Sequence, residues 1–229
     1  MPADAALVAA ARSVLADAGD PAVAPGQQAY MKSEMPYYGI TATRLKIALR
    51  PFLRAYAPID RATHEATILA LWDGATHREE RYAAVAFARH RLARPWLDPD
   101  ALSLHRHLVV TGAWWDHVDE IASHLVGSVL AGHRPTATPV IRAWAEDDDL
   151  WVRRTSVLSQ LSHKADTDTD LLRFAIETNV DDTSFWLRKA IGWSLREYAR
   201  TDPDWVRAEV TRLGPRLSGL SRREALKHL

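Results

Sequence analysis

The sequence predicts an all-α protein, and three observations support this prediction. Apolar residues recur at helical spacing along most of the 229-residue chain. No segment alternates apolar and polar residues as a half-buried strand would. The helical pattern itself recurs with a period of about 36 residues, which is typical of repeat proteins. We therefore expect a single helical domain over residues 1–229.

The N-terminal part of the chain is expected to form five helices separated by turn residues. The first, over residues 5–18, is rich in alanine, the strongest helix former, and Gly19-Asp20-Pro21 ends it. Pro36-Tyr37-Tyr38-Gly39 ends the second, and Thr43 is expected to cap the third. The other predicted helices cover residues 27–34, 44–56, 66–72 and 78–90.

The repeat is visible in five segments that align on their helical phase. Their anchor positions lie 36, 36, 35 and 36 residues apart: Glu79, Trp115, Trp151, Trp186 and Arg222. Each of the first four segments follows a shorter predicted helix and a polar turn; these shorter helices cover residues 68–71, 102–110, 140–145 and 171–178. The turns at residues 146–149 and 181–184 contain Asp, Thr and Ser, which favour helix N-caps.

A helix pair of this kind cannot bury its own apolar face, so successive pairs stack into an α-solenoid of the HEAT or armadillo type. In a curved solenoid the second helices line the concave face side by side. Polar and aromatic residues of three second helices are therefore expected to converge on one groove: Trp115, Asp119, Trp151, Arg154, Lys189, Trp193 and Arg196.

Composition excludes several classes of function. The chain has no cysteine, so disulfides and thiolate chemistry are impossible. No apolar run is long enough to cross a bilayer, and the N-terminus lacks the features of a signal peptide, so a cytoplasmic protein is expected. The histidines do not form an HExxH motif, and neither a metal site nor a phosphate-binding loop is predicted.

Charge is balanced overall but not along the chain. The 29 basic and 29 acidic residues cancel, which alone gives no support to nucleic-acid binding. From Trp186 onward, however, the net charge is +5, because ten Lys and Arg residues face five acids. This segment is either an anion-binding surface or a set of solvated helix faces.

Trp115 and Asp119 are the strongest pair of candidate site residues. Residues four apart share one helix face, so the indole and the carboxylate point the same way. An aromatic surface beside an anion suits a site that holds a sugar ring and stabilises positive charge on it. Considered singly, the tryptophan is more often a core residue, and the aspartate favours a helix start. Trp114 lies roughly 100° away around the helix and is expected to pack.

Two further patterns concern basic residues. Arg153-Arg154 and Arg188-Lys189 occupy equivalent places in consecutive repeats, which gives a stripe of cations that phosphates could use. Lys189, Trp193 and Arg196 share one helix face. Such a mixture suits either nucleic-acid backbone and bases or a surface packed by cation–π contacts.

Six segments together resemble the AlkD family of DNA glycosylases, which are built of HEAT-like repeats and remove alkylated bases. These segments are YMKSEMPYYGI, LWDGATHREERYAA, WWDHVD, WVRRTSVLSQL, RKAIGWSLREYART and SRREALKHL. The resemblance extends from Tyr30 to the end of the chain. It departs locally at Thr41–Lys46, where the family has a Thr-Pro-Glu-Arg-Arg run, and at Ser162, where a lysine is common.

The resemblance implies a role for individual residues. Asp119 would be the catalytic carboxylate, Trp115 and Trp193 would contact the sugar, and Arg154 would contact a phosphate. Four further residues would contact DNA: Tyr30, Lys164, Lys189 and Arg196.

The function that the resemblance implies is hydrolysis of the N-glycosidic bond of cationic alkylated purines, such as N3-methyladenine and N7-methylguanine. The substrate would be double-stranded DNA, the base would not be flipped, and no metal or small-molecule cofactor would be needed. We expect a monomer that is cytoplasmic and associated with the nucleoid when bound to DNA. The alternatives are a non-catalytic HEAT-repeat module that binds DNA or protein, and a surface over residues 186–229 for an acidic protein.

Overall fold

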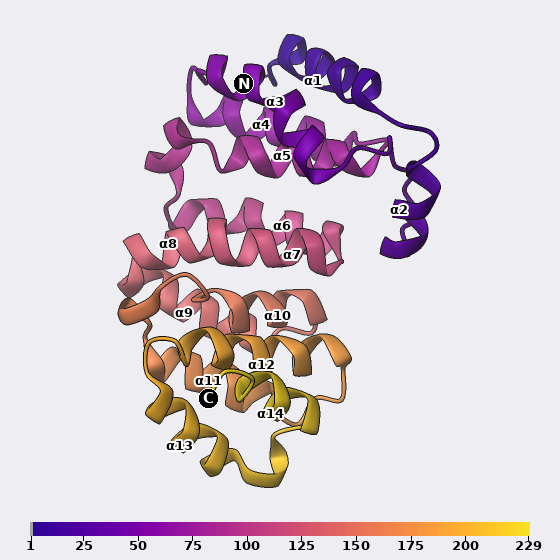
Figure 1. Cartoon of the computed structure of the whole chain (residues 1–229). Coiled ribbons are helices and arrows are strands. Elements are labelled where there is room, and N and C mark those ends of the chain that lie inside the picture. Colours follow the sequence, from indigo (N-terminus) through magenta and orange to yellow (C-terminus); the bar gives the residue numbers. More distant parts are fainter. Residues whose placement is uncertain (1) are drawn as a thin grey trace. The chain divides into compact units, whose positions relative to one another are not determined.

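The computed structural model describes residues 2–229 and contains helices but no strand among them, which confirms the all-α prediction. Contacts divide the chain into two compact units, referred to below as unit 1 (to Trp96) and unit 2 (Leu97–Leu229) (Figure 1). The predicted single domain over residues 1–229 stays a prediction. No helix of the described residues is long and apolar enough to span a membrane.

Unit 1 contains five α-helices and a short 3-10 helix. They are α1 (Ala5–Ala18), α2 (Ala24–Met31), α3 (Ala42–Ala55), α4 (Arg61–Asp73), α5 (Arg78–Ala88) and η1 (Arg91–Trp96). The bounds of the first helix are those predicted. Three sequence predictions were wrong in detail, and the first is the start of α4, which begins at Arg61 rather than at residue 66. Helix α2 begins at Ala24, because Pro25 suits a first helical turn. Thr41, not Thr43, caps α3, its hydroxyl accepting from the amide of Arg44.

Two buried glutamates of α5 hold the loop between α2 and α3. The Glu79 carboxylate accepts hydrogen bonds, each 3.0 Å long, from the backbone N–H groups of Tyr38, Gly39 and Ile40. Glu80 accepts from Arg12 and from the Tyr38 hydroxyl. Gly39 has φ +89°, and a Cβ there would lie 2.1 Å from a backbone oxygen. The PYYG turn and the HREER segment therefore form one structural feature.

Unit 2 contains helices connected by short turns. In order they are η2 (Pro99–Ala101), α6 (Leu102–Gly112), α7 (Trp115–Glu120), the π-helical turn η3 (Ile121–Val126), α8 (Gly127–Gly132), α9 (Arg134–Ala145), α10 (Leu150–Leu158), η4 (Lys164–Asp166), α11 (Thr169–Asn179), α12 (Phe185–Tyr198), α13 (Pro203–Leu213), η5 (Gly214–Arg216) and α14 (Gly219–Ala225).

The helices of unit 2 pack as successive pairs. The second members of the pairs form a row, in which α7 contacts α10, α10 contacts α12, and α12 contacts α14 (Figure 1). Asp149 and Ser184 cap α10 and α12, as the turn composition predicted. This all-helical arrangement is consistent with an α-solenoid, and its assignment as HEAT-like repeats with a concave DNA-binding face stays a prediction.

The core of unit 2 brings these helices together. Buried residues of α10, α11, α12 and α13 form a continuous apolar cluster that includes Leu158, Ile176, Leu195 and Val206. Trp193 is half-buried and packs against this cluster. One side of α12 is thus fixed by the core, which leaves its remaining faces for the site described next.

Candidate active site

A carboxylate and a guanidinium form the centre of the candidate site. Arg154 Nε donates to Asp119 Oδ1 at 2.7 Å, and Arg154 Nη2 donates to Asp119 Oδ2 at 2.8 Å. Such a two-point contact fixes the plane of the carboxylate as well as its position. The pair is largely buried, since 13% of the Asp119 side chain and 3% of the Arg154 side chain are exposed. Arg154 therefore orients Asp119.

A third helix completes the contact. The Nη1 of Arg154 donates to the backbone carbonyl of Trp186, in the first turn of α12. The guanidinium carbon also lies 5.8 Å from the centre of the Trp186 ring. One arginine of α10 thus connects the carboxylate of α7 to the start of α12. The sequence predicted that residues of these three helices would meet, but not that this carbonyl would take part.

The electrostatic environment of Asp119 favours proton retention. Burial raises the pKa of Asp119 above its ordinary value of 3.8, and the nearby charge of Asp116 adds to the rise. The hydrogen bonds and charge of Arg154 oppose the rise without cancelling it. Asp119 is therefore a carboxylate held in one orientation in a poorly solvated place.

The local chain path explains how Asp119 is presented. Trp114 is extended (φ −154°), and α7 begins at Trp115, so Trp115 and Asp119 lie four residues apart on one short helix. Directly after it, η3 forms a π-helical turn, in which the Ser123 hydroxyl donates to the Asp119 carbonyl oxygen. Turns of this kind occur frequently at functional sites. Trp115 is half-buried.

Three tryptophans pack together, and one of them, Trp186, contacts Arg154. The rings of Trp114, Trp151 and Trp186 are 5.2–6.0 Å apart, centre to centre, and tilted or edge-on to one another. Trp114 is thus a packing residue, as expected. In the sequence Trp186 served only as a repeat anchor, whereas Trp151 was also expected among the residues of the groove. Their recurrence at one helical phase was the signal for this cluster.

The predicted DNA-contacting cations of α12 share one acidic partner. Lys189 Nζ lies 2.6 Å from Glu224 Oε1, and Arg196 pairs with the other oxygen of Glu224. Trp193 lies between the two cations in the sequence of α12, and Glu224 belongs to α14. A Cβ on Gly192 would lie 2.6 Å from the Glu224 Cβ, so α12 and α14 cross closely here. Sequence reasoning overlooked Glu224, although it belongs to the fifth repeat segment.

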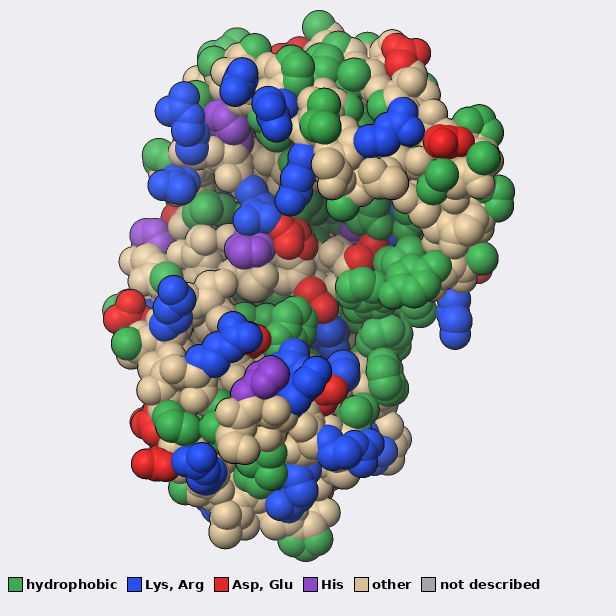
Figure 2. Space-filling view, viewed as in Figure 1, with side chains coloured by type: hydrophobic (Ala, Val, Ile, Leu, Met, Phe, Trp, Pro, Cys, Tyr) green, Lys and Arg blue, Asp and Glu red, His purple; other side chains and the backbone are tan. Residues whose placement is uncertain are grey.

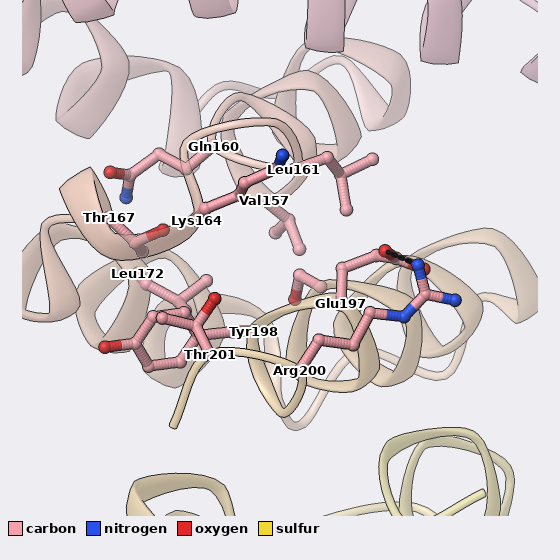
Figure 3. Close-up of a pocket in the computed structure, with 11 residues that line it drawn as sticks. Val157, Gln160, Leu161, Lys164, Thr167, Leu172, Glu197, Tyr198, Arg200 and Thr201 are labelled. Carbon is pink, nitrogen blue, oxygen red and sulfur yellow. Dashed lines mark ion pairs between the residues drawn. The ribbon is translucent and has the colours of Figure 1, made fainter. Parts of the chain in front are cut away.

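The two other predicted DNA-contacting residues are Lys164, in unit 2, and Tyr30, in unit 1. Lys164 is exposed, has φ +52°, and lines a pocket of about 290 Å³ (Figure 3). Val157, Leu161 and Leu172 also line this pocket; Asp119, Trp115 and Trp193 do not. Tyr30 belongs to unit 1, at the end of α2, and is 77% exposed.

Surface charge does not gather in one place on the face shown in Figure 2, where Lys and Arg side chains form several separate groups. Within unit 2, many cations have an acidic partner: Arg106, Arg153, Arg154, Arg173, Lys189, Arg196, Arg200, Arg207, Arg212 and Arg216. Six of the ten cations from Trp186 onward are therefore held in ion pairs. Within the described residues, no group of three or more His, Asp and Glu side chains could hold a metal ion.

Comparisons with known proteins identify similar chains. The model of a family described as DNA alkylation repair enzyme matches residues 11–229. A solved structure from Enterococcus faecalis, described as a predicted DNA alkylation repair enzyme, is 32% identical to this chain with a TM-score of 0.83. That match covers 92% of this chain and 96% of the other. No curated protein matches the chain.

Proposed function

Because this chain belongs to the DNA alkylation repair enzyme family, whose substrate is DNA, we propose that it is an alkylpurine DNA glycosylase. It hydrolyses the N-glycosidic bond of N3-methyladenine and N7-methylguanine in double-stranded DNA, and Asp119 is its catalytic carboxylate. The observation that carries the proposal is the two-point contact of Asp119 with Arg154 at 2.7 and 2.8 Å.

The chemistry needs little beyond a well-placed negative charge. Alkylation makes the purine cationic, so the departing base takes the electron pair of the C1′–N bond and becomes neutral. The sugar then carries the positive charge, which is greatest at the transition state, and an oriented carboxylate stabilises it. Water adds at C1′ and loses a proton, as in glycoside hydrolysis by carboxylates.

Asp119 retains the capacity for this role despite its contact with Arg154. An ionised carboxylate has about four lone-pair sites, and Arg154 occupies two of them. The remaining sites can face a sugar or a water molecule. Since the orientation is set before substrate binds, little reorganisation accompanies the reaction.

Two aromatic residues are assigned to the sugar. Trp115 shares α7 with Asp119, and Trp193 lies on α12, whose first turn Arg154 contacts. Their rings would contact the deoxyribose and stabilise its positive charge by cation–π attraction. The base need not leave the stack in this arrangement, because the reacting groups approach the sugar. For the predicted phosphate contact, Arg154 would have to leave Asp119 or bind Asp119 and a phosphate at the same time.

The direct test is Asp119→Asn, which keeps the shape of the side chain but removes its charge. Loss of a catalytic group typically lowers rates by a factor of about 100 to 10,000. We therefore expect a loss of this order in N7-methylguanine release from duplex DNA, with DNA affinity retained. The measurement is single-turnover release of free base, with circular dichroism as a check on folding.

The matched control is Asp116→Asn, which removes the same charge three residues away on the same helix. It is expected to keep at least a third of the wild-type rate. Near wild-type release by Asp119→Asn would rule out the catalytic assignment. If the wild-type protein itself binds methylated duplex but releases no base, a non-catalytic repeat module is the better description.

A further inference from the structure

The exposed half of α3 in unit 1 is basic and has no acidic counterpart. It carries Arg44, Lys46, Arg50 and Arg54, all exposed, and residues 35–59 contain no Asp or Glu. Within the described part of the chain none of these four side chains has an ion pair. The cations of α12, in contrast, share Glu224.

The helix is fixed in a way that keeps this face outward. Leu49 is buried in the core of unit 1, and Leu45 and Leu53 pack against the same cluster. Lys46, Arg50 and Arg54 are four residues apart and therefore lie in one row. Steps of four residues place the row along roughly 12 Å of the helix axis. The row is thus a rigidly mounted line of positive charge.

We propose that this row of α3 binds the phosphodiester backbone of DNA, as a contact separate from the Asp119 site. The inference rests on the proposed function, which makes DNA the substrate. Duplex DNA carries one negative charge per about 1.7 Å of its axis, so a 12 Å row faces several phosphates. Long cations without acidic partners can contact phosphates without first breaking an ion pair.

An anionic membrane is the other polyanion that such a helix could meet. A helix that lies in a membrane surface inserts its apolar face among the lipids. In α3 that face is already buried in the core, and the only large apolar side chain exposed on the helix is Ile47, at 57%. The observations therefore favour a polyanion recognised by charge alone.

The experiment uses the triple variant Lys46→Gln, Arg50→Gln, Arg54→Gln in the full chain. Glutamine keeps the helix propensity and removes the charges. Affinity for an undamaged duplex is measured between 50 and 200 mM salt. Loss of three phosphate contacts lowers the salt slope by about 2.7. The wild type should then lose about 40-fold more affinity over this range than the variant.

The matched control removes three exposed arginines that have acidic partners: Arg106→Gln, Arg207→Gln and Arg216→Gln. This control lowers the net charge by the same amount as the α3 triple variant. Its salt slope should change by less than about 0.9, the value for one phosphate contact. Equal slopes for the two variants would overturn the proposal, since only total charge would matter. If the α3 triple variant does not fold, each single variant should lower the slope by about 0.9.

Two further measurements separate this inference from the glycosylase proposal. Base release at saturating DNA should stay within threefold of wild type in the α3 variant, whereas Asp119→Asn loses it. Loss of binding to phosphatidylserine vesicles with an unchanged DNA salt slope would assign the face to membranes instead. A normal DNA slope change with no base release by the wild type would overturn only the glycosylase proposal.

Discussion

At the scale of single residues, Asp119 combines two opposing influences. Burial raises its pKa, while Arg154 holds its ionised form by two hydrogen bonds. The sequence predicted Asp119 and Trp115 as partners on one face, because helical spacing is a local property. For Arg154, in contrast, the sequence predicted contact with a phosphate. Its pairing with Asp119 depends on how two residues 35 positions apart are buried together, which the local sequence does not show.

The raised pKa of Asp119 gives a pH prediction. The proposed reaction needs the ionised carboxylate, so the release rate should fall as pH decreases through the pKa of Asp119. Below that pKa the rate should fall about tenfold per pH unit. This acidic limb of the pH–rate profile should lie at higher pH than it would for an ordinary aspartate. Single-turnover release, corrected for spontaneous depurination, measures the limb. Arg154→Gln should move it to higher pH, and a limb that persists in Asp119→Asn would belong to another group.

At the scale of elements, the crossing of α12 and α14 places an acid over two predicted DNA-binding cations. The helices themselves were predictable from their spacing and caps, including Asp149 and Ser184. Errors arose where two residues of one type competed locally for the same role, as Thr41 and Thr43 did for the N-cap of α3. The contact of Glu224 with Lys189 and Arg196 depends on packing between helices, which the repeat period suggested only in outline.

Glu224→Gln tests this crossing. Removal of the carboxylate frees Lys189 and Arg196, and glutamine preserves the close contact with Gly192. If both cations contact DNA, the salt slope of duplex binding should increase by up to about 1.8. Glu65→Gln, which removes the ion pair of Glu65 with Arg61 in unit 1, removes the same charge as a control. An unchanged slope in Glu224→Gln would exclude Lys189 and Arg196 from the DNA contact.

At the scale of the whole molecule, stability should depend on pH through a histidine buried in unit 1. Burial lowers the pKa of His64 to about 4, and the charges of His90 and Arg61 contribute. His64 Nδ1 lies 2.6 Å from the hydroxyl of Tyr56, whose pKa burial raises to about 12. Since the unfolded chain binds a proton near pH 6.5, stability is greatest above that value and falls as pH decreases toward 4.

The expected loss between pH 7 and pH 4.5 is about 2–3 kcal/mol in the free energy of unfolding. Urea unfolding at the two pH values measures it. His64→Gln keeps an acceptor for the Tyr56 hydroxyl but cannot titrate, so it should lose correspondingly less between them. Equal losses in variant and wild type would mean that other groups govern the acid response. This dependence was hidden in the sequence, because nothing local marks His64 as buried.

The π-helical turn η3 determines which insertions and deletions unit 2 can accept at this point of the chain. Both Asp119 before the turn and Gly127 after it face α10: Asp119 contacts Arg154, and a Cβ on Gly127 would lie 2.6 Å from the Ser159 carbonyl oxygen. In a regular α-helix these positions would differ by roughly 80° around the axis. The wider turn rotates less per residue and reduces that difference. Deleting one residue between Ile121 and Val126 would leave Asp119 and Gly127 seven residues apart in a regular α-helix, roughly 20° from each other around the axis, so both would still face α10. One inserted residue, in contrast, would rotate one of the two positions away from α10 by roughly 100° and so affect the site without replacing any of its residues.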